Sequence, residues 1–174
     1  MIRQPMVEEE VSMRIRSCTQ IVGGLLLAIW PLICSAEQAV DLLKRLYAEH
    51  QPWRQQDVMK GAALEKFFEQ SLYRLYRRDR DCQAPGWGVG LLDFDPILDG
   101  QDFDDQGISS PTFQNVGQRD AVTYLVTFQL FPKLSETRQE VQYRLRKSGK
   151  EWRIFDISYS KGRSLRQILS SPCE

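Results

Sequence analysis

The chain has little of the material from which most metal and nucleic-acid sites are built. It contains one histidine and four cysteines in 174 residues, and 23 Lys and Arg balance 23 Asp and Glu. A structural zinc site takes four Cys or His ligands, and only two of the cysteines, Cys82 and Cys173, lie beyond the N-terminal segment that we interpret below as a signal peptide, so such a site is a poor fit. The zero net charge removes the chain-wide field that would attract nucleic acid or an anionic membrane. We therefore expect no metal, no cofactor and no nucleic-acid partner.

Catalytic signatures are also missing. The chain has no nucleophile motif, no glycine-rich phosphate loop and no HExxH zinc motif. The stretch GWGVG at 86–90 is not followed by a helix pattern, so we interpret it as a loop that presents Trp87 to a partner, with core packing as an equal alternative. His50 ends a predicted helix, where an imidazolium interacts favourably with the helix dipole, and is interpreted as a cap rather than a catalytic base. These features favour a protein that is not an enzyme.

The longest apolar run, IVGGLLLAIWPLIC at 21–34, is shorter than the roughly 20 residues that span a bilayer. Arg14 and Arg16 precede it, and small residues end at Ala36, which is the pattern of a secretory signal peptide cleaved after that residue. We predict a signal peptide at 1–36, with Met13 as an alternative start. A membrane anchor and a lipid-modified Cys34 are less favoured alternatives, so we expect a periplasmic or secreted bacterial protein without stable membrane insertion after cleavage.

The remaining segment, 37–174, has the length of a single domain. Its two cysteines, Cys82 and Cys173, form an even pair in a protein predicted to be exported, which favours a disulfide. Such a bridge would close a long loop and stabilise the fold by about 4 kcal/mol in the chain-entropy description.

The hydrophobic pattern changes its period along this segment. Residues 38–50 and 62–78 have helical spacing, residues 83–107 are broken by glycine and proline, and residues 108–116, 121–131, 140–146 and 151–159 alternate as strands do. Turn residues between the strands predict a four-stranded antiparallel meander whose apolar face is covered by the two helices. A short helical turn at 164–169, with Ser164 as its cap, ends the chain. The predicted fold class is α+β.

Two short motifs suggest a family. Asp95, Pro96, Gln101 and Asp102 form a D-P-x-x-x-x-Q-D element, and Trp152, Ile154, Asp156 and Ile157 form a W-x-I-x-D-I element on the last strand. With the order of the elements, these motifs resemble a bacterial family of exported or lipid-anchored domains of unknown function, with the cone-shaped fold of the nuclear-transport-factor-2-like superfamily. The resemblance implies helices on a curved sheet, a pocket between them, and no established reaction.

The stretch DFDPILDGQDFDD at 93–105 carries six carboxylates and no Lys or Arg. Its spacing fails the EF-hand pattern, although an irregular cation site that uses Asp99, Asp102, Asp104 and Asp105 is an alternative. Asp95 before Pro96 is expected to accept backbone N–H groups in a turn. Gln101 and Asp102 are expected to anchor the loop to the sheet edge, which leaves Asp99, Asp104 and Asp105 as charge for a basic partner.

Asp156 lies in the middle of a predicted strand. If it faces inward with Trp152 and Ile154, it needs a hydrogen-bonding or charged partner, because a lone buried carboxylate is costly. An inward Asp156 would mark the pocket, and the alternative is a solvated Asp at the end of the strand.

We therefore interpret the chain as a non-enzymatic, exported binding domain of the bacterial envelope. Its partner is expected to be a protein, in the manner of a toxin-immunity protein, an inhibitor or an envelope accessory factor, or else a small ligand in the pocket. The candidate contacts are Asp156, Asp95, Gln101, Asp102, Trp87, Asp99, Asp104 and Asp105. One alternative is a pocket enzyme of hydrolase or isomerase type that uses Asp156 with a tyrosine. Another is a module stabilised by a divalent cation in the loop at 93–105.

Overall fold

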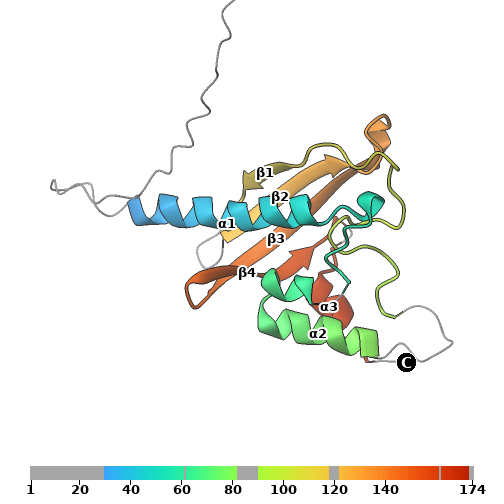
Figure 1. The fold of residues 1–174 in the computed structure, drawn as a ribbon. Helices are drawn as coiled ribbons and strands as arrows, with labels where there is room; N and C mark the ends of the chain where they lie inside the picture. Colours follow the sequence, from blue (N-terminus) through green and yellow to red (C-terminus); the bar gives the residue numbers. More distant parts are fainter. Residues whose placement is uncertain (1–29, 61, 82–89, 118–121, 161, 173–174) are drawn as a thin grey trace, which may run out of the picture.

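A computed structural model describes residues 30–60, 62–81, 90–117, 122–160 and 162–172 (Figure 1). The helices are α1 (Trp30–Glu49), α2 (Gln70–Asp81) and α3 (Leu165–Leu169), with short 3-10 turns η1 (Pro52–Arg54), η2 (Ala63–Lys66) and η3 (Ser135–Thr137). The strands are β1 (Thr112–Asn115), β2 (Val122–Gln129), β3 (Arg138–Ser148) and β4 (Glu151–Ser158). The α+β class is confirmed.

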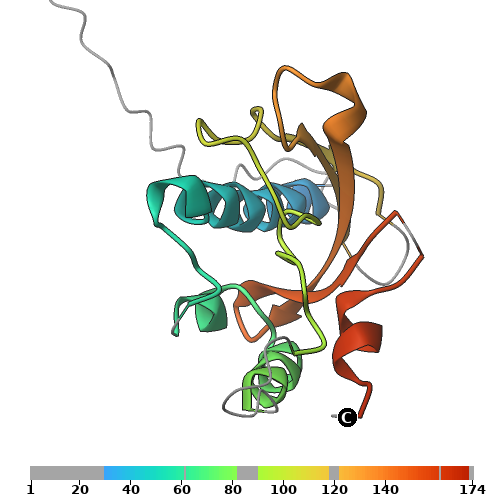
Figure 2. The same ribbon diagram turned by 90° about the vertical axis from the view of Figure 1, so that its right-hand side faces the viewer.

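The four strands form one antiparallel meander in the order β1-β2-β3-β4, as the alternating pattern predicts. Alternate residues of the central strands are buried, namely Tyr124, Val126 and Phe128 in β2 and Val141, Tyr143 and Leu145 in β3. Figure 1 shows α1 lying across the sheet, and the turned view in Figure 2 shows this helix on one side of the strands. The leucine stripe of α1 and Tyr47 are buried against it, so the predicted helical cover is confirmed for α1.

The second predicted helix, at 62–78, is divided in two. The backbone between η2 and α2 pairs with the outer edge of β4, where Ile154 N–H donates to Phe67 O at 2.8 Å and Glu69 N–H donates to Ile154 O at 2.9 Å. Because these groups bond to a strand, the helical ladder cannot run through them. The first helix also differs from its predicted range, since α1 begins at Trp30 rather than at residue 38.

A bulge in β4 changes which residues face the core. Arg144 of β3 pairs with Asp156, whereas the next residue, Leu145, pairs with Ile154, so Phe155 is the extra residue of the bulge. Ile154 and Ile157 are consequently both fully buried, which strict alternation would not allow. The inward orientation on which a pocket site at Asp156 depended is therefore wrong.

Asp156 instead supports the start of α3. Its Oδ1 atom accepts the backbone N–H groups of Ile157 at 2.9 Å and Arg166 at 3.1 Å. Ser164 is the N-cap of the same helix and forms a reciprocal capping box with Gln167, which confirms the predicted cap. A carboxylate at this end of a helix satisfies N–H groups that lack a partner within the helix.

Arg166 ties α3 to β4 and α2. Its guanidinium lies 4.0 Å from the centre of the Phe155 ring, with that of Arg146 at 3.5 Å from the same centre. Arg166 also donates to Phe155 O at 2.6 Å and to Ser71 Oγ of α2 at 2.5 Å, and it pairs with Glu69, directly before α2, at 3.1 Å. These contacts hold the outer end of the sheet against both helices.

Several predictions concern residues outside the described ranges. Trp87 and both cysteines of the predicted disulfide, Cys82 and Cys173, lie there, as does the segment 1–29 that contains most of the predicted signal peptide. These remain predictions. Within the described ranges, no helix is long and apolar enough to cross a membrane.

Candidate functional site: an acidic pocket beside a buried histidine

Asp95 closes a tight turn in the loop between α2 and β1. Its backbone N–H donates to Gly100 O at 2.9 Å, and its side-chain Oδ1 accepts the N–H groups of Ile97 at 2.8 Å and Leu98 at 3.1 Å. This is the geometry expected of an Asp before Pro96. Ile97 and Leu98, which lie within this turn, are fully buried in the core.

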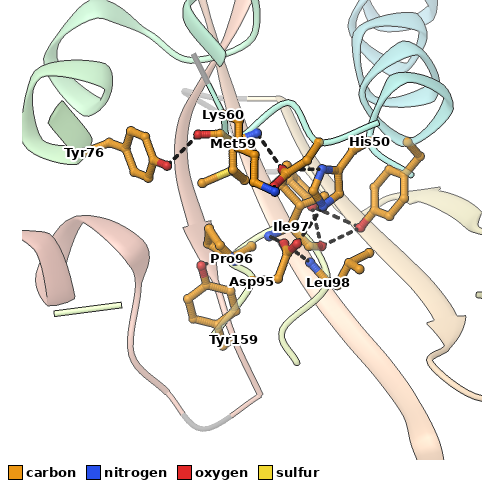
Figure 3. A network of polar contacts seen from close by, with 12 residues as sticks. His50, Met59, Lys60, Tyr76, Asp95, Pro96, Ile97, Leu98 and Tyr159 are labelled. Carbon is orange, nitrogen blue, oxygen red and sulfur yellow. Dashed lines mark hydrogen bonds and ion pairs between the residues drawn. The ribbon is translucent and has the colours of Figure 1, made fainter. Parts of the chain in front are cut away.

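Three tyrosines from different elements bond to carbonyl groups of this turn, and Figure 3 labels one of them, Tyr159, beside Pro96. The hydroxyls of Tyr47 in α1 and Tyr143 in β3 lie 3.0 Å apart and bond to Ile97 O at 3.2 and 3.1 Å. Tyr159, just after β4, donates to Pro96 O at 3.2 Å. Burial raises the pKa of each of these three hydroxyls well above its ordinary value, so all three stay protonated donors near neutral pH.

His50 follows α1 directly and is completely buried. Its backbone N–H donates to Leu46 O at 2.8 Å, as in the last turn of a helix. On the side chain, Nε2 lies 2.7 Å from Asp95 Oδ2 and Nδ1 lies 3.5 Å from Asp57 Oδ1. Nδ1 has no hydrogen-bond partner within the described part of the chain. The sequence pattern predicts the position of His50 at the helix end but not its burial between two carboxylates.

A pocket of about 180 Å³ is lined in part by both of these carboxylates. Its walls come from the turn after η1, from α2 and from the loop that leads into Asp95, and the lining residues are Asp57, Met59, Tyr76, Asp79, Arg80, Leu92, Phe94, Asp95 and Pro96. Three carboxylates and one arginine thus line this pocket. We call this space the acidic pocket.

Backbone N–H groups hold each carboxylate of the acidic pocket. Met59 N–H donates to Asp57 Oδ1 at 2.9 Å, and Leu91 N–H donates to Asp79 Oδ1 at 2.7 Å. Asp79 is only 2% exposed. Lys60 lies outside, its ammonium 3.6 Å from Asp57 Oδ2 and largely in solvent. The carboxylates are therefore positioned before any ligand arrives.

Tyr76 joins α2 to the same pocket wall. Its hydroxyl donates to Met59 O at 2.8 Å, a contact that Figure 3 shows beside the His50 cluster. Burial is the largest cause that raises the pKa of this hydroxyl, so Tyr76 adds no charge to the pocket near neutral pH.

Of the predicted contact residues that the structure describes, only Asp95 lines the acidic pocket. Gln101 bonds to Asp93 at 3.4 Å, and Asp102 is exposed, so the predicted anchor of Gln101 and Asp102 at the sheet edge is wrong. The anchor is made instead by backbone bonds from Asp104 to Leu130 O and from Ser109 to Gln129 O, both at 3.0 Å.

The remaining acids of the loop have separate local roles or are exposed. Asp104 accepts the N–H of Gln106 at 2.8 Å, Asp105 is exposed, and Asp99 adopts a left-handed backbone with φ 50°. Within the described ranges, no group of three or more His, Cys, Asp or Glu side chains is arranged to hold a metal ion. The alternative of a cation-stabilised module gains no support from this loop.

Two other hollows have mixed charge. One of about 300 Å³ lies between α1 and the β3–β4 turn, and one of about 390 Å³ lies along the arginine-rich side of α2. Asp156 lines neither of them, nor the acidic pocket. These three pockets therefore give no support to the enzyme alternative that uses Asp156.

No protein-family model, curated protein or solved structure matches this chain. The function must therefore be inferred from the chemistry of the acidic pocket.

Proposed function

We propose that this protein is an exported, non-enzymatic binding domain with a cone fold of the nuclear-transport-factor-2-like type. Its acidic pocket receives the ammonium or guanidinium group of a Lys or Arg side chain on a protein partner. The observation that carries this proposal is the meeting of Asp57, Asp79 and Asp95 around a small pocket that contains one arginine, Arg80.

Electrostatics supports a cationic ligand. Three carboxylates and one guanidinium leave an excess of negative charge, and a partly buried charge is screened less than one in open water. Backbone N–H groups already orient the carboxylates, so little reorganisation opposes binding. Exposed Asp102 and Asp105 add negative charge on the same loop, which suits a basic partner surface.

The arrangement supports binding over catalysis. Histidine is the commonest general base, and the chain's one histidine is fully buried behind the pocket wall rather than in it. Asp156, the residue of the enzyme alternative, supports α3.

The pocket can be tested by nuclear magnetic resonance with Nα-acetyl-arginine amide and Nα-acetyl-lysine amide as probes. The backbone amides that bond to the three carboxylates are built-in reporters: Met59 for Asp57, Leu91 for Asp79, and Ile97 with Leu98 for Asp95. We expect saturable shifts at these amides, and little change for Nα-acetyl-glutamate amide. Probes that leave these amides unshifted would contradict the proposal.

Matched variants separate the pocket from general surface charge. Asp79→Asn should weaken probe binding by about 10- to 150-fold, since a hydrogen bond to a charged group contributes about 1.5–3 kcal/mol. Asp41→Asn is the control, because Asp41 is an exposed residue of α1 that pairs with Lys44. Equal effects of the two substitutions would show that the probe senses net charge and not the pocket.

The protein partner can be sought by capture from envelope extract with the wild-type protein and Asp79→Asn side by side. We expect a partner that is recovered by the wild type and lost with the variant. Recovery of the same proteins by both would place the contact elsewhere.

A further inference from the structure

The imidazole of His50 shares two carboxylates with the acidic pocket. Nε2 lies 2.7 Å from Asp95 Oδ2, and Nδ1 lies 3.5 Å from Asp57 Oδ1. Both aspartates line the pocket, whereas the ring itself has no solvent exposure. Figure 3 shows the ring of His50 beside Asp95. A ligand in the pocket and a proton on His50 would thus both be attracted by the same two negative groups.

The contacts indicate which nitrogen gains and loses a proton. Asp95 Oδ2 is an acceptor at hydrogen-bonding distance, so Nε2 carries a hydrogen atom in both charge states. Nδ1 is the variable site, and it faces Asp57 without a hydrogen bond to any described residue. A neutral Nδ1 turns a lone pair toward a carboxylate, whereas a protonated Nδ1 turns a positive N–H toward it.

Other charged or titratable groups surround this pair. Asp79, Arg80 and Tyr76 face the pocket from α2, Lys60 contacts Asp57 from the solvent side, and Tyr47 and Tyr143 face the Asp95 turn from α1 and β3. Among these residue types, only histidine ordinarily changes its charge between pH 5 and 8.

We propose that a basic group in the acidic pocket and a proton on His50 antagonise each other, so that the protein binds its ligand more tightly as the pH rises from 5.5 to 8. This inference rests on the proposed function. A protonated His50 cancels one of the negative charges that attract the ligand. By linkage, the bound ligand lowers the proton affinity of His50 by the same factor, and binding releases protons.

The first test measures the affinity for Nα-acetyl-arginine amide at pH 5.5, 6.5 and 8.0 by calorimetry in two buffers of different ionisation heat. We expect an increase of about tenfold across this range, within the roughly 5- to 150-fold span of coupled sites, and net proton release at the middle pH. The key variant is His50→Gln, which keeps an N–H donor for Asp95 but cannot titrate. Its affinity should be independent of pH, and an equal pH dependence in both proteins would overturn the inference.

A second test does not depend on the stability of His50→Gln. Because the chain has one histidine, the imidazole Hε1 resonance of His50 is unambiguous. We expect its titration midpoint to fall on saturation with the probe and also to fall in Asp57→Asn without a probe. Asp41→Asn on the exposed side of α1 is the control that should leave the midpoint in place.

The outcomes distinguish the two proposals. Probe binding with an unchanged His50 midpoint would overturn the antagonism and leave the proposed function standing. Absence of probe binding at all three pH values would overturn both proposals. A midpoint that falls equally in Asp57→Asn and Asp41→Asn would show a general charge effect, which also overturns the inference.

Discussion

Gly107 lies where the loop after the Asp95 turn packs closely against the side chain of Trp53. Its φ is +100°, a conformation that L side chains rarely adopt, and a Cβ atom there would lie 2.6 Å from Trp53 Cε2. The Trp53 ring cannot easily retreat, because it packs edge-on against Phe103 with ring centres 6.0 Å apart.

We predict that Gly107→Ala lowers the free energy of unfolding by about 2–4 kcal/mol, because backbone strain and overpacking add. Gly149→Ala is the matched control, since Gly149 also has a positive φ of +63° but its Cβ would meet no atom within 4 Å. It should cost only about 1 kcal/mol, the usual penalty of an L residue in this conformation. Urea unfolding measures both, and equal losses would show that the contact with Trp53 carries no cost.

At the residue scale, the sequence predicts the hydrogen bonds that a side chain makes to backbone groups close to it along the chain. The turn at Asp95 and Pro96 and the cap at Ser164 were both predictable, because each bonds to backbone within three residues. The partnership of His50 with Asp95 was not predictable, since 45 residues separate them and only the packed fold brings them together.

At the scale of elements, the errors have one common cause. Periodicity correctly predicts the four strands and their order, but it cannot detect a backbone that bonds to a distant strand. The segment around Phe68 reads as helix and pairs with Ile154 instead. The bulge at Phe155 likewise turns Asp156 away from the core, and no spacing rule marks an inserted residue in advance.

The start of α3 gives a test of the structural role of Asp156. We predict that Asp156→Ala destabilises the protein by about 1 kcal/mol, comparable to the loss of the cap in Ser164→Ala. Asp156→Asn should cost less, because its amide oxygen can still accept the N–H groups of Ile157 and Arg166. Unfolding in urea gives the stabilities.

The same variants should bind Nα-acetyl-arginine amide as the wild type does, because Asp156 does not line the acidic pocket. A loss of affinity in Asp156→Ala greater than in Ser164→Ala would return Asp156 to the binding site.

At the scale of the whole molecule, Tyr47, Tyr143 and Tyr159 make the fold sensitive to alkali. Burial raises the pKa of each hydroxyl in the folded state, so their contribution to stability is complete below the ordinary tyrosine pKa of about 10. The contribution is lost as the pH rises above that value, since the unfolded chain then gives up protons that the folded chain retains.

We predict that these three hydroxyls ionise together with unfolding between about pH 10 and 12.5. Phenolate absorbance at 295 nm and the far-ultraviolet circular dichroism should change over the same pH interval. In urea, the absorbance change should move down to about pH 10, the value of an exposed tyrosine. Complete ionisation before any change in circular dichroism would contradict the burial of these hydroxyls.

Tyrosine hydroxyls from α1, β3 and the segment just after β4 bond to the carbonyl groups of Pro96 and Ile97. These bonds should slow hydrogen exchange in this loop. The amides of Ile97 and Leu98 lie in an irregular loop, yet they are buried, bonded to Asp95, and attached to the central sheet through their neighbours. We expect them to exchange with deuterium as slowly as the amides of β3, only through global opening. Exchange that is as fast as in the exposed turn at Gly149 would show that this loop opens by itself.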